Sequence, residues 1–239
     1  MKNLMIMNRS ALCFLFLLAT ISLFAQWGDK GVNRIEEARK VGNFDKISVA
    51  YGIDLHLHQS DKTSVSVKAK KEVMEHIVTE VKGGRLEIKM DSWKRSNKGP
   101  IDVTVHVPNL KAISASGGSD VYGKGDWKFD DLDVSLSGGS DFEMQLTAKN
   151  VNCNASGGSD IDISGMAKTI DINCSGGSDV SAKSFKVKQC NANASGGSDI
   201  EIYVTESINA NASGASDITY KGDPSKVKVR SSGSSDISN

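Results

Sequence analysis

Apolar and small residues alternate with polar ones through the second half of the chain, in blocks that precede a recurring Gly-rich pentapeptide. The residues one, three and five places before each pentapeptide are mostly apolar or small, and those between them are polar. This period of two predicts strands with one buried face. A further apolar residue follows each pentapeptide, at Val121, Phe142, Ile161, Val180, Ile200, Ile218 and Ile237. Each block is therefore expected to be a strand, a bend, a second strand and a return of variable length.

The pentapeptide occurs seven times, five times as Ser-Gly-Gly-Ser-Asp and then as Ser-Gly-Ala-Ser-Asp and Ser-Gly-Ser-Ser-Asp. Successive aspartates are 21, 19, 19, 20, 18 and 19 residues apart, at Asp120, Asp141, Asp160, Asp179, Asp199, Asp217 and Asp236. A nearly constant period of this length predicts a solenoid, in which each turn buries its apolar side against its neighbours. We predict an all-β fold, a right-handed parallel β-helix with rungs of about 19 residues. The motifs should stack in register, and the returns should absorb the differences in spacing.

Each bend is expected to depend on its glycines, because backbone conformations with positive φ are cheap only without a Cβ. The Ser and Asp beside them can hydrogen-bond nearby backbone groups. Other solenoids fit less well, because the chain lacks a leucine framework, a six-residue sub-period and a second Gly-rich loop per turn.

Residues 44–239 are expected to form one domain, in which 44–110 are an irregular capping half and 111–239 are the seven rungs. Gly52-Ile53-Asp54 retains part of the bend and predicts a degenerate rung. Strands are expected at 65–69, 85–90 and 101–107. One short helix is expected over 71–78, with one apolar face made by Val73, Met74, Ile77 and Val78. The polar residues 26–43 are expected to form a mobile lead-in.

Residues 1–25 have the pattern of a secretory signal peptide. Lys2 and Arg9 flank the start of an apolar run from Ala11 to Ala19, and small residues lead to a cleavage site after Ala25. The run is too short for a stable anchor, and no second apolar stretch of spanning length follows. The 239-residue chain has a formal net charge of zero, and removal of the leader leaves −2. We therefore expect an exported protein with no membrane span in the mature chain and no nucleic-acid partner.

Three cysteines remain after the leader, Cys153, Cys174 and Cys190, and all fall at inward positions. Rungs ~4.8 Å apart and a two-residue offset place Cys153 and Cys174 about 8 Å apart. That distance exceeds the reach of a disulfide. We interpret the three thiols as small buried hydrophobic groups rather than as a redox or metal site.

Two outward columns of polar residues are candidate sites. The seven motif aspartates would stack into a carboxylate ladder, whose repulsion must be offset by hydrogen bonds, protonation or a cation. Local capping of the bend is the favoured interpretation, and calcium binding is the functional alternative. Two places before the motif, stacked asparagines are expected to hydrogen-bond amide to amide, at Asn154, Asn173, Asn193 and Asn211.

A third candidate lies in the capping half, where Asp54, His56 and His58 alternate on one predicted strand face. These residues could bind zinc or copper if His106 or another group completed the shell. Solvated strand residues explain the pattern equally well. Catalysis has less support, because an active site is usually unique whereas the conspicuous Ser and Asp residues are repeated. No His lies in the repeats to act as a base.

The chain also resembles a known family. The residues that carry the resemblance are Phe44-Asp45-Lys46-Ile47, Gly84-Arg85-Leu86-Glu87-Ile88 and the seven repeats. Over roughly residues 41–236 the chain resembles the putative autotransporter-adhesin head domain, or head GIN domain, of Gram-negative bacteria. The resemblance implies a right-handed β-helix and a periplasmic, cell-surface or secreted location, and it supplies no catalytic residues.

Two function classes follow from these patterns. The first is a non-catalytic, exported cell-envelope scaffold that binds glycan or protein through the solenoid faces, without a cofactor other than calcium. The second is a carbohydrate-active β-helix enzyme acting on polysaccharide. Retention of a glycan without release of product would favour the first class.

Overall fold

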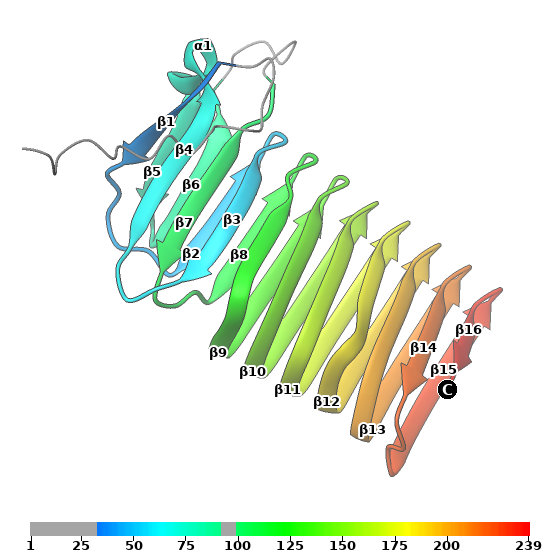
Figure 1. Cartoon of the computed structure of the whole chain (residues 1–239). Coiled ribbons are helices and arrows are strands. Elements are labelled where there is room, and N and C mark those ends of the chain that lie inside the picture. The colour runs from blue at the N-terminus through cyan, green and yellow to red at the C-terminus, as the bar shows by residue number, and fades with distance from the viewer. Residues whose placement is uncertain (1–32, 92–98) are drawn as a thin grey trace, which may run out of the picture. The chain divides into compact units, whose positions relative to one another are not determined.

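A computed structural model describes residues 33–91 and 99–239 of the chain. The predicted signal peptide lies outside the described residues. The described chain is almost entirely β-structure (Figure 1). The N-terminal part contains β1 (Arg34–Arg39), β2 (Lys46–Ala50), β3 (Asp54–Gln59), β4 (Ser64–Lys70), α1 (Lys71–Met74), β5 (Ile77–Lys82), β6 (Arg85–Met90), β7 (Asp102–Val107) and β8 (Ala112–Ser116). The repeats contain β9 (Val121–Ser137), β10 (Asp141–Gly157), β11 (Asp160–Gly176), β12 (Asp179–Gly196), β13 (Asp199–Gly214), β14 (Asp217–Lys221), β15 (Lys226–Gly233) and β16 (Asp236–Ser238).

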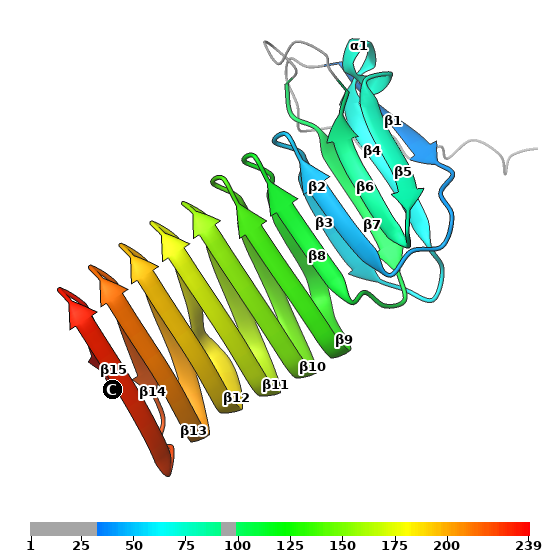
Figure 2. The same ribbon diagram turned by 180° about the vertical axis from the view of Figure 1, so that it is seen from behind.

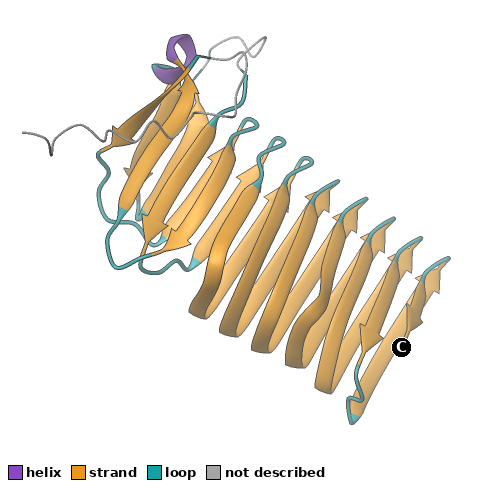
Figure 3. Ribbon diagram, in the orientation of Figure 1, coloured by secondary structure: helices purple, strands orange, loops and turns teal. Residues whose placement is uncertain are grey.

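The repeats form a parallel β-solenoid of about seven turns, each of about 19 residues, as the sequence predicts. The strands β9 to β13 are 16 to 18 residues long. Each runs along one side of the stack, around an edge and back along the other side (Figures 1 and 2). Figure 3 shows loops at the Gly-rich edge of these coils and continuous strand around the opposite edge. Each coil therefore has two outward faces and one enclosed core.

The motif aspartates stack in register, as predicted. Asp160 is the Cα partner of both Asp141 and Asp179, and the pairing continues through Asp199, Asp217 and Asp236. The register shifts where the spacing differs, for example between Ala182 and Lys186. These irregularities lie in the half of each coil that follows the motif, so the motif and the strand before it keep one register throughout.

The inward columns form one continuous apolar core. Their side chains are almost completely buried in all but the last coil, with Val134, Ile172 and Ile200 at 0% exposure, whereas Val227 and Val229 in β15 are exposed. All three cysteines are buried and free, which agrees with their interpretation as small hydrophobic groups. Burial raises the thiol pKa to about 12 for Cys153, about 11 for Cys174 and about 12 for Cys190.

The two glycines of the motif have different backbone conformations, and the predicted need for positive φ holds throughout only for the first. The first glycine has positive φ in all seven copies, at Gly117, Gly138, Gly157, Gly176, Gly196, Gly214 and Gly233. The second has positive φ only at Gly118 and Gly139. The later bends therefore accept a side chain at the second position, as Ala215 and Ser234 show.

The second serine of the motif is buried and joins successive bends. Ser119, Ser140 and Ser159 are 0% exposed. The main-chain N–H of Ser119 donates to Oγ of Ser140 at 3.2 Å, and that of Ser140 donates to Oγ of Ser159 at 3.2 Å. Several of these hydroxyls also donate within their own bend, as Ser140 does to the carbonyl oxygen of Ser137 and Ser159 to that of Ser156, both at 3.1 Å. Because a buried polar group is costly unless it is hydrogen-bonded, this ladder holds the bends in register.

The N-terminal part continues the stack with less regular coils. β2 and β3 form a coil that pairs in parallel with β8 and β9, so the predicted degenerate rung is present. β6 and β7 form the next coil, in parallel with β2 and β3. β5 and β4 then pair antiparallel with this coil, and β1 pairs antiparallel with β4.

Two expectations for this part are wrong in detail. The helix spans only Lys71–Met74, because Ile77 and Val78 belong to β5, which pairs with β6. Residues 34–39, which were placed in the mobile lead-in, form β1. Pairing with β4 satisfies the backbone hydrogen bonds of β1. Its polar sequence, RIEEAR, lacks the apolar alternation that would have predicted a strand.

Candidate functional site

The motif carboxylates form a column along one face of the solenoid. Asp54 and Asp102 extend the column beyond Asp120, because they are register partners in the N-terminal coils. Within the repeats, the carboxylates accept hydrogen bonds from the next coil. Donation from Asp141 N–H to Oδ1 of Asp120 spans 3.2 Å, and equivalent bonds join Asp199 to Asp179, Asp217 to Asp199 and Asp236 to Asp217 at 3.0–3.3 Å. These hydrogen bonds join each carboxylate to the next coil rather than cap the bend within one coil.

Like charge nevertheless affects this column. The pKa of Asp141 is raised, first because the group is partly desolvated and then because Asp120 and Asp160 lie on either side. Among residues 33–91 and 99–239, no group of three or more His, Cys, Asp or Glu side chains is placed to hold a metal ion. Calcium binding along the column therefore stays a prediction, which melting in calcium and in chelator would test.

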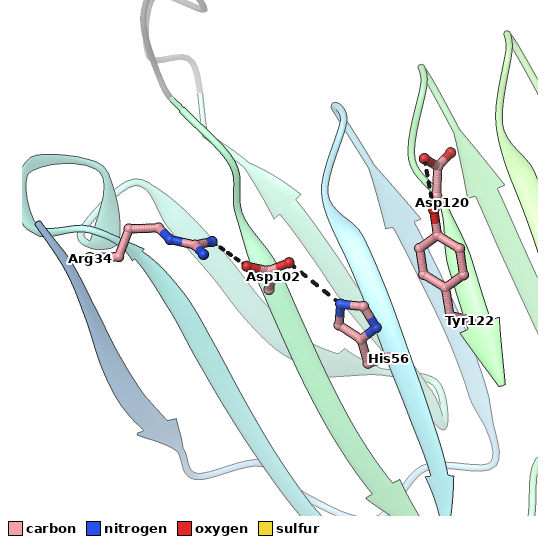
Figure 4. Close-up of polar contacts among 5 residues, drawn as sticks. All are labelled: Arg34, His56, Asp102, Asp120 and Tyr122. Atoms are coloured by element: carbon pink, nitrogen blue, oxygen red, sulfur yellow. Dashed lines mark hydrogen bonds and ion pairs between the residues drawn. The ribbon is translucent and has the colours of Figure 1, made fainter. Parts of the chain in front are cut away.

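The column lies beside a cluster of His and Tyr side chains where the N-terminal coils meet the first repeat strand, β9 (Figure 4). Nε2 of His56 lies 3.4 Å from Oδ1 of Asp102, whose other carboxylate oxygen pairs with Arg34. The His56 ring stacks on Tyr122 with centroids 5.4 Å apart. The Tyr122 hydroxyl donates to Asp120 at 3.5 Å. Four strands, β1, β7, β3 and β9, thus contribute to one chain of polar contacts.

His58 lies in the neighbouring outward column. Its ring stacks on that of His106 with centroids 4.7 Å apart, and His106 contacts Oγ of Ser64 at 3.3 Å. The pKa of His58 is lowered, first by burial and then by the nearby His106, His56 and Lys124. The pKa of Tyr122 is raised, first because its hydroxyl is partly buried and then because carboxylates surround it.

The metal site considered for Asp54, His56 and His58 stays a prediction. In the structure the imidazoles of His56 and His58 stack on different partners in different columns. The sequence analysis missed Asp102 and Tyr122. The available signal was that Asp102 and His106 have the same four-residue spacing as Asp54 and His58, and in the structure these residues are register partners.

The second face carries the asparagine ladder, and the expected amide hydrogen bonds are present. Nδ2 of Asn173 donates to Oδ1 of Asn154 at 3.1 Å. Asn193 donates in the same way to Asn173, and Asn211 to Asn193, both at 3.0 Å. The ladder runs parallel to the column formed by the first serine of each motif.

Two surface hollows follow these columns, one of about 770 Å³ and one of about 450 Å³. We call the surface that they share the Asn/Ser groove. Its outward residues are the ladder column and the first motif serines, Ser114, Ser116, Ser135, Ser137, Asn154, Ser156, Asn173, Ser175, Asn193, Ser195, Asn211 and Ser213. The charged residues that line the hollows are Glu87 and Lys89, which pair at 2.7 Å, and Arg230.

Within the described ranges, no helix has the length and apolar character needed to cross a bilayer.

Comparison with known proteins gives a family and a set of structural relatives. Residues 43–224 match the family described as "Putative auto-transporter adhesin, head GIN domain". A crystal structure of a putative adhesin from Bacteroides fragilis is similar, with 27% identity, a TM-score of 0.83 and coverage of 86% of this chain and 96% of that chain.

Two further crystal structures share the fold at lower identity. One is a putative adhesin from Parabacteroides distasonis, with 23% identity, a TM-score of 0.71 and coverage of 87% of this chain and 98% of that one. The other, from the same species, is described as a putative lipid binding protein, with 22% identity, a TM-score of 0.68 and coverage of 86% and 96%. No curated protein gives a significant match.

Proposed function

The chain belongs to the family of putative auto-transporter adhesins with a head GIN domain, and from that premise we propose that it is a non-catalytic, adhesin-like scaffold of the cell envelope. In this proposal the protein is exported by its leader to the periplasm or the cell surface, or is secreted. It binds an envelope glycan or a protein through the outward faces of the solenoid.

One observation carries the proposal: the same outward side chains recur in register from coil to coil. The Asp160–Asp179 pair and the Asn154–Asn173 pair occupy equivalent positions on neighbouring coils. A surface of this kind presents many equivalent weak contacts to an extended partner, and such contacts add through effective concentration. Along the described repeats these side chains are spread over successive coils, whereas an enzyme site usually brings its catalytic groups together in one pocket.

The test uses beads coated with the purified protein, which are incubated with a glycan array, with immobilised extracellular proteins and with soluble polysaccharides. Retention of a glycan or protein without release of shortened sugars supports the scaffold. Failure to retain any of these partners contradicts it.

A carbohydrate-active enzyme remains the second candidate because one polar contact chain occurs once rather than once per coil. His56 lies against Asp102 and Tyr122, an arrangement in which an imidazole is oriented by a carboxylate. If polysaccharide is cleaved, His56→Gln should abolish product release while leaving retention unchanged. Cleavage that survives His56→Gln would exclude this contact chain as the catalytic site.

A further inference from the structure

The two hollows of the Asn/Ser groove follow each other along one face of the stack, and their lining residues lie on neighbouring strands of that face. The smaller hollow ends at Asn154 and Ser156, and the larger hollow begins at Asn173 and Ser175 on the next coil. The two hollows are joined by the Asn173–Asn154 hydrogen bond. On this face nine strands from β6 to β15 lie side by side. At ~4.8 Å per strand the groove is about 40 Å long.

The floor of the groove is the backbone of the strands, because the residues between its two outward columns turn their side chains into the core. Along the larger hollow these inward residues are Cys174, Ala194 and Ala212. The outward residues beside them are asparagines and serines, whose side chains rise little above the strands. An extended ligand can therefore approach the sheet closely over several consecutive coils.

The amide ladder leaves hydrogen-bonding capacity directed outward. An asparagine amide has two N–H donors and an oxygen that can accept two hydrogen bonds. Within the ladder, Asn173 and Asn193 each donate one bond to one neighbour and accept one from the other. Each therefore retains one donor and one acceptor site. The result is a donor and an acceptor on each of these two consecutive coils, in fixed orientation because the ladder holds the amides.

The charge of the groove differs from that of the opposite face. From β8 to β13 the lining residues are uncharged, and charges occur only at its ends, at the paired Glu87 and Lys89 and at Arg230. The opposite face carries the carboxylate column. A ligand that bears both donors and acceptors but no charge fits the groove better than the acidic face, because neither partner has to strip water from an ionised group.

We propose that the Asn/Ser groove binds a neutral, unbranched polysaccharide lying along the solenoid axis. Sugar hydroxyls donate and accept hydrogen bonds, so they can pair with both sites of each ladder amide and with the serine hydroxyls. This inference rests on the proposed function and names the ligand class and the face that binds it. Individual contacts are weak, and the affinity comes from their repetition along consecutive coils.

The test is native affinity electrophoresis of the purified protein in gels that contain a β-1,4-glucan, a β-1,4-mannan, an α-1,4-glucan or a polyuronate. At least one neutral polymer should retard the protein, and the polyuronate should retard it less. Ser195→Lys places a long charged side chain across the groove and should weaken retardation at least tenfold. The double variant Asn173→Asp, Asn193→Asp should act in the same direction, because it removes ladder donors and adds charge.

The matched control is Ser181→Lys, which makes the same replacement in the same strand, β12, on the opposite face between Asp162 and Glu201. It should leave retardation unchanged, and all variants are compared by circular dichroism and melting before use. The inference is overturned if no neutral polymer retards the protein, if only the polyuronate does, or if Ser195→Lys has no larger effect than Ser181→Lys. Retention of glycan or protein by coated beads in those cases leaves the broader scaffold proposal standing, whereas loss of all retention removes both.

Discussion

The bend of the β2–β3 coil and the bends of the repeats perform the same turn with different residues. The repeats use Ser-Gly-Gly-Ser-Asp, and the β2–β3 coil uses Ala50-Tyr51-Gly52-Ile53-Asp54. Tyr51 occupies the position of the first glycine with φ at 72°, and among the described residues it is the one non-glycine with positive φ. Ile53, at 0% exposure, replaces the buried serine. The position of the bend in the stack therefore determines its conformation, and the glycine of the repeat sequence lowers the conformational strain of adopting it.

The difference is also visible where the two regions meet. Ser119 is the first member of the serine ladder, and its Oγ accepts hydrogen bonds from Gly52 N–H at 3.0 Å and Ile53 N–H at 3.1 Å. The repeat thus supplies the acceptor that the β2–β3 bend lacks. Both regions share the apolar core, and the repeats add ladders of serine and asparagine hydrogen bonds that recur from coil to coil.

The largest expected loss of stability comes from substituting one of two glycines that both have positive φ. A Cβ at Gly165, where φ is 112°, would lie 2.0 Å from the carbonyl oxygen of Leu146 in the neighbouring coil. A Cβ at Gly83, where φ is 56°, meets nothing within 4 Å. Gly165→Ala should lower the free energy of unfolding by more than ~3 kcal/mol. Gly83→Ala should cost only about 1–2 kcal/mol, from the left-handed conformation. Urea denaturation measures both, and equal losses would show that coil contact does not set the cost.

The serine ladder gives the next effect. Ser140→Ala removes the acceptor of Ser119 N–H and leaves that buried donor unpaired, which should cost about 1–3 kcal/mol. Ser137→Ala is the control, because this exposed serine contributes to the bend through its carbonyl oxygen, which alanine retains. It should change stability by less than ~0.5 kcal/mol. If the two variants are equally stable, the ladder does not hold the bends.

A smaller gain is expected in the β2–β3 bend. Tyr51→Gly should relieve the positive-φ strain, which costs a non-glycine residue about 1–2 kcal/mol. The greater freedom of glycine in the unfolded chain offsets part of this, so a net stabilisation of about 0.5–1 kcal/mol is expected. A loss of stability on the same denaturation curve would mean that contacts of the Tyr51 side chain outweigh its backbone strain.

The smallest effect is a pH dependence confined to the N-terminal coils. The pKa of His58 is lowered from 6.5 in the folded chain, so protonation favours the unfolded state. Stability should therefore fall as the pH drops below about 6.5 and level off below the folded-state pKa. His58→Gln should reduce this slope in melting experiments between about pH 7 and 5, with little change above pH 7. An unchanged slope would assign the dependence to other groups.

The sequence predicts the repeats well and the N-terminal coils only in part, for physical reasons. A period of two within a period near nineteen specifies which residues stack, so the register of Asp160 with Asp179 and the Asn154–Asn173 bond both follow from it. The burial of Ser140 does not follow, because serine is more often exposed. Its signal was that Ser and Asp never vary in the seven motifs, whereas the preceding position changes to Ala215 and Ser234.

The missed features of the N-terminal coils depend on single long-range pairings. β1 forms because β4 offers an edge, and the helix stops at Met74 because residues 77–82 pair with β6. Neither pairing has a repeat to reveal it. The His56–Asp102 contact likewise joins residues from two strands, and only the parallel pairing of β3 with β7 brings them together.

Differences in coil length are accommodated in the half-coil after each motif. The number of coils, and with it the length of the solenoid, can therefore vary. Spacings of 18 to 21 residues leave every motif in register. Because each coil contacts only its neighbours, a whole coil can be gained or lost without redesign of the others. Each such change alters the reach of the protein by ~4.8 Å and adds or removes one row of outward side chains. Duplication or loss of a gene segment that encodes one coil would therefore change the length of the protein in steps of one coil.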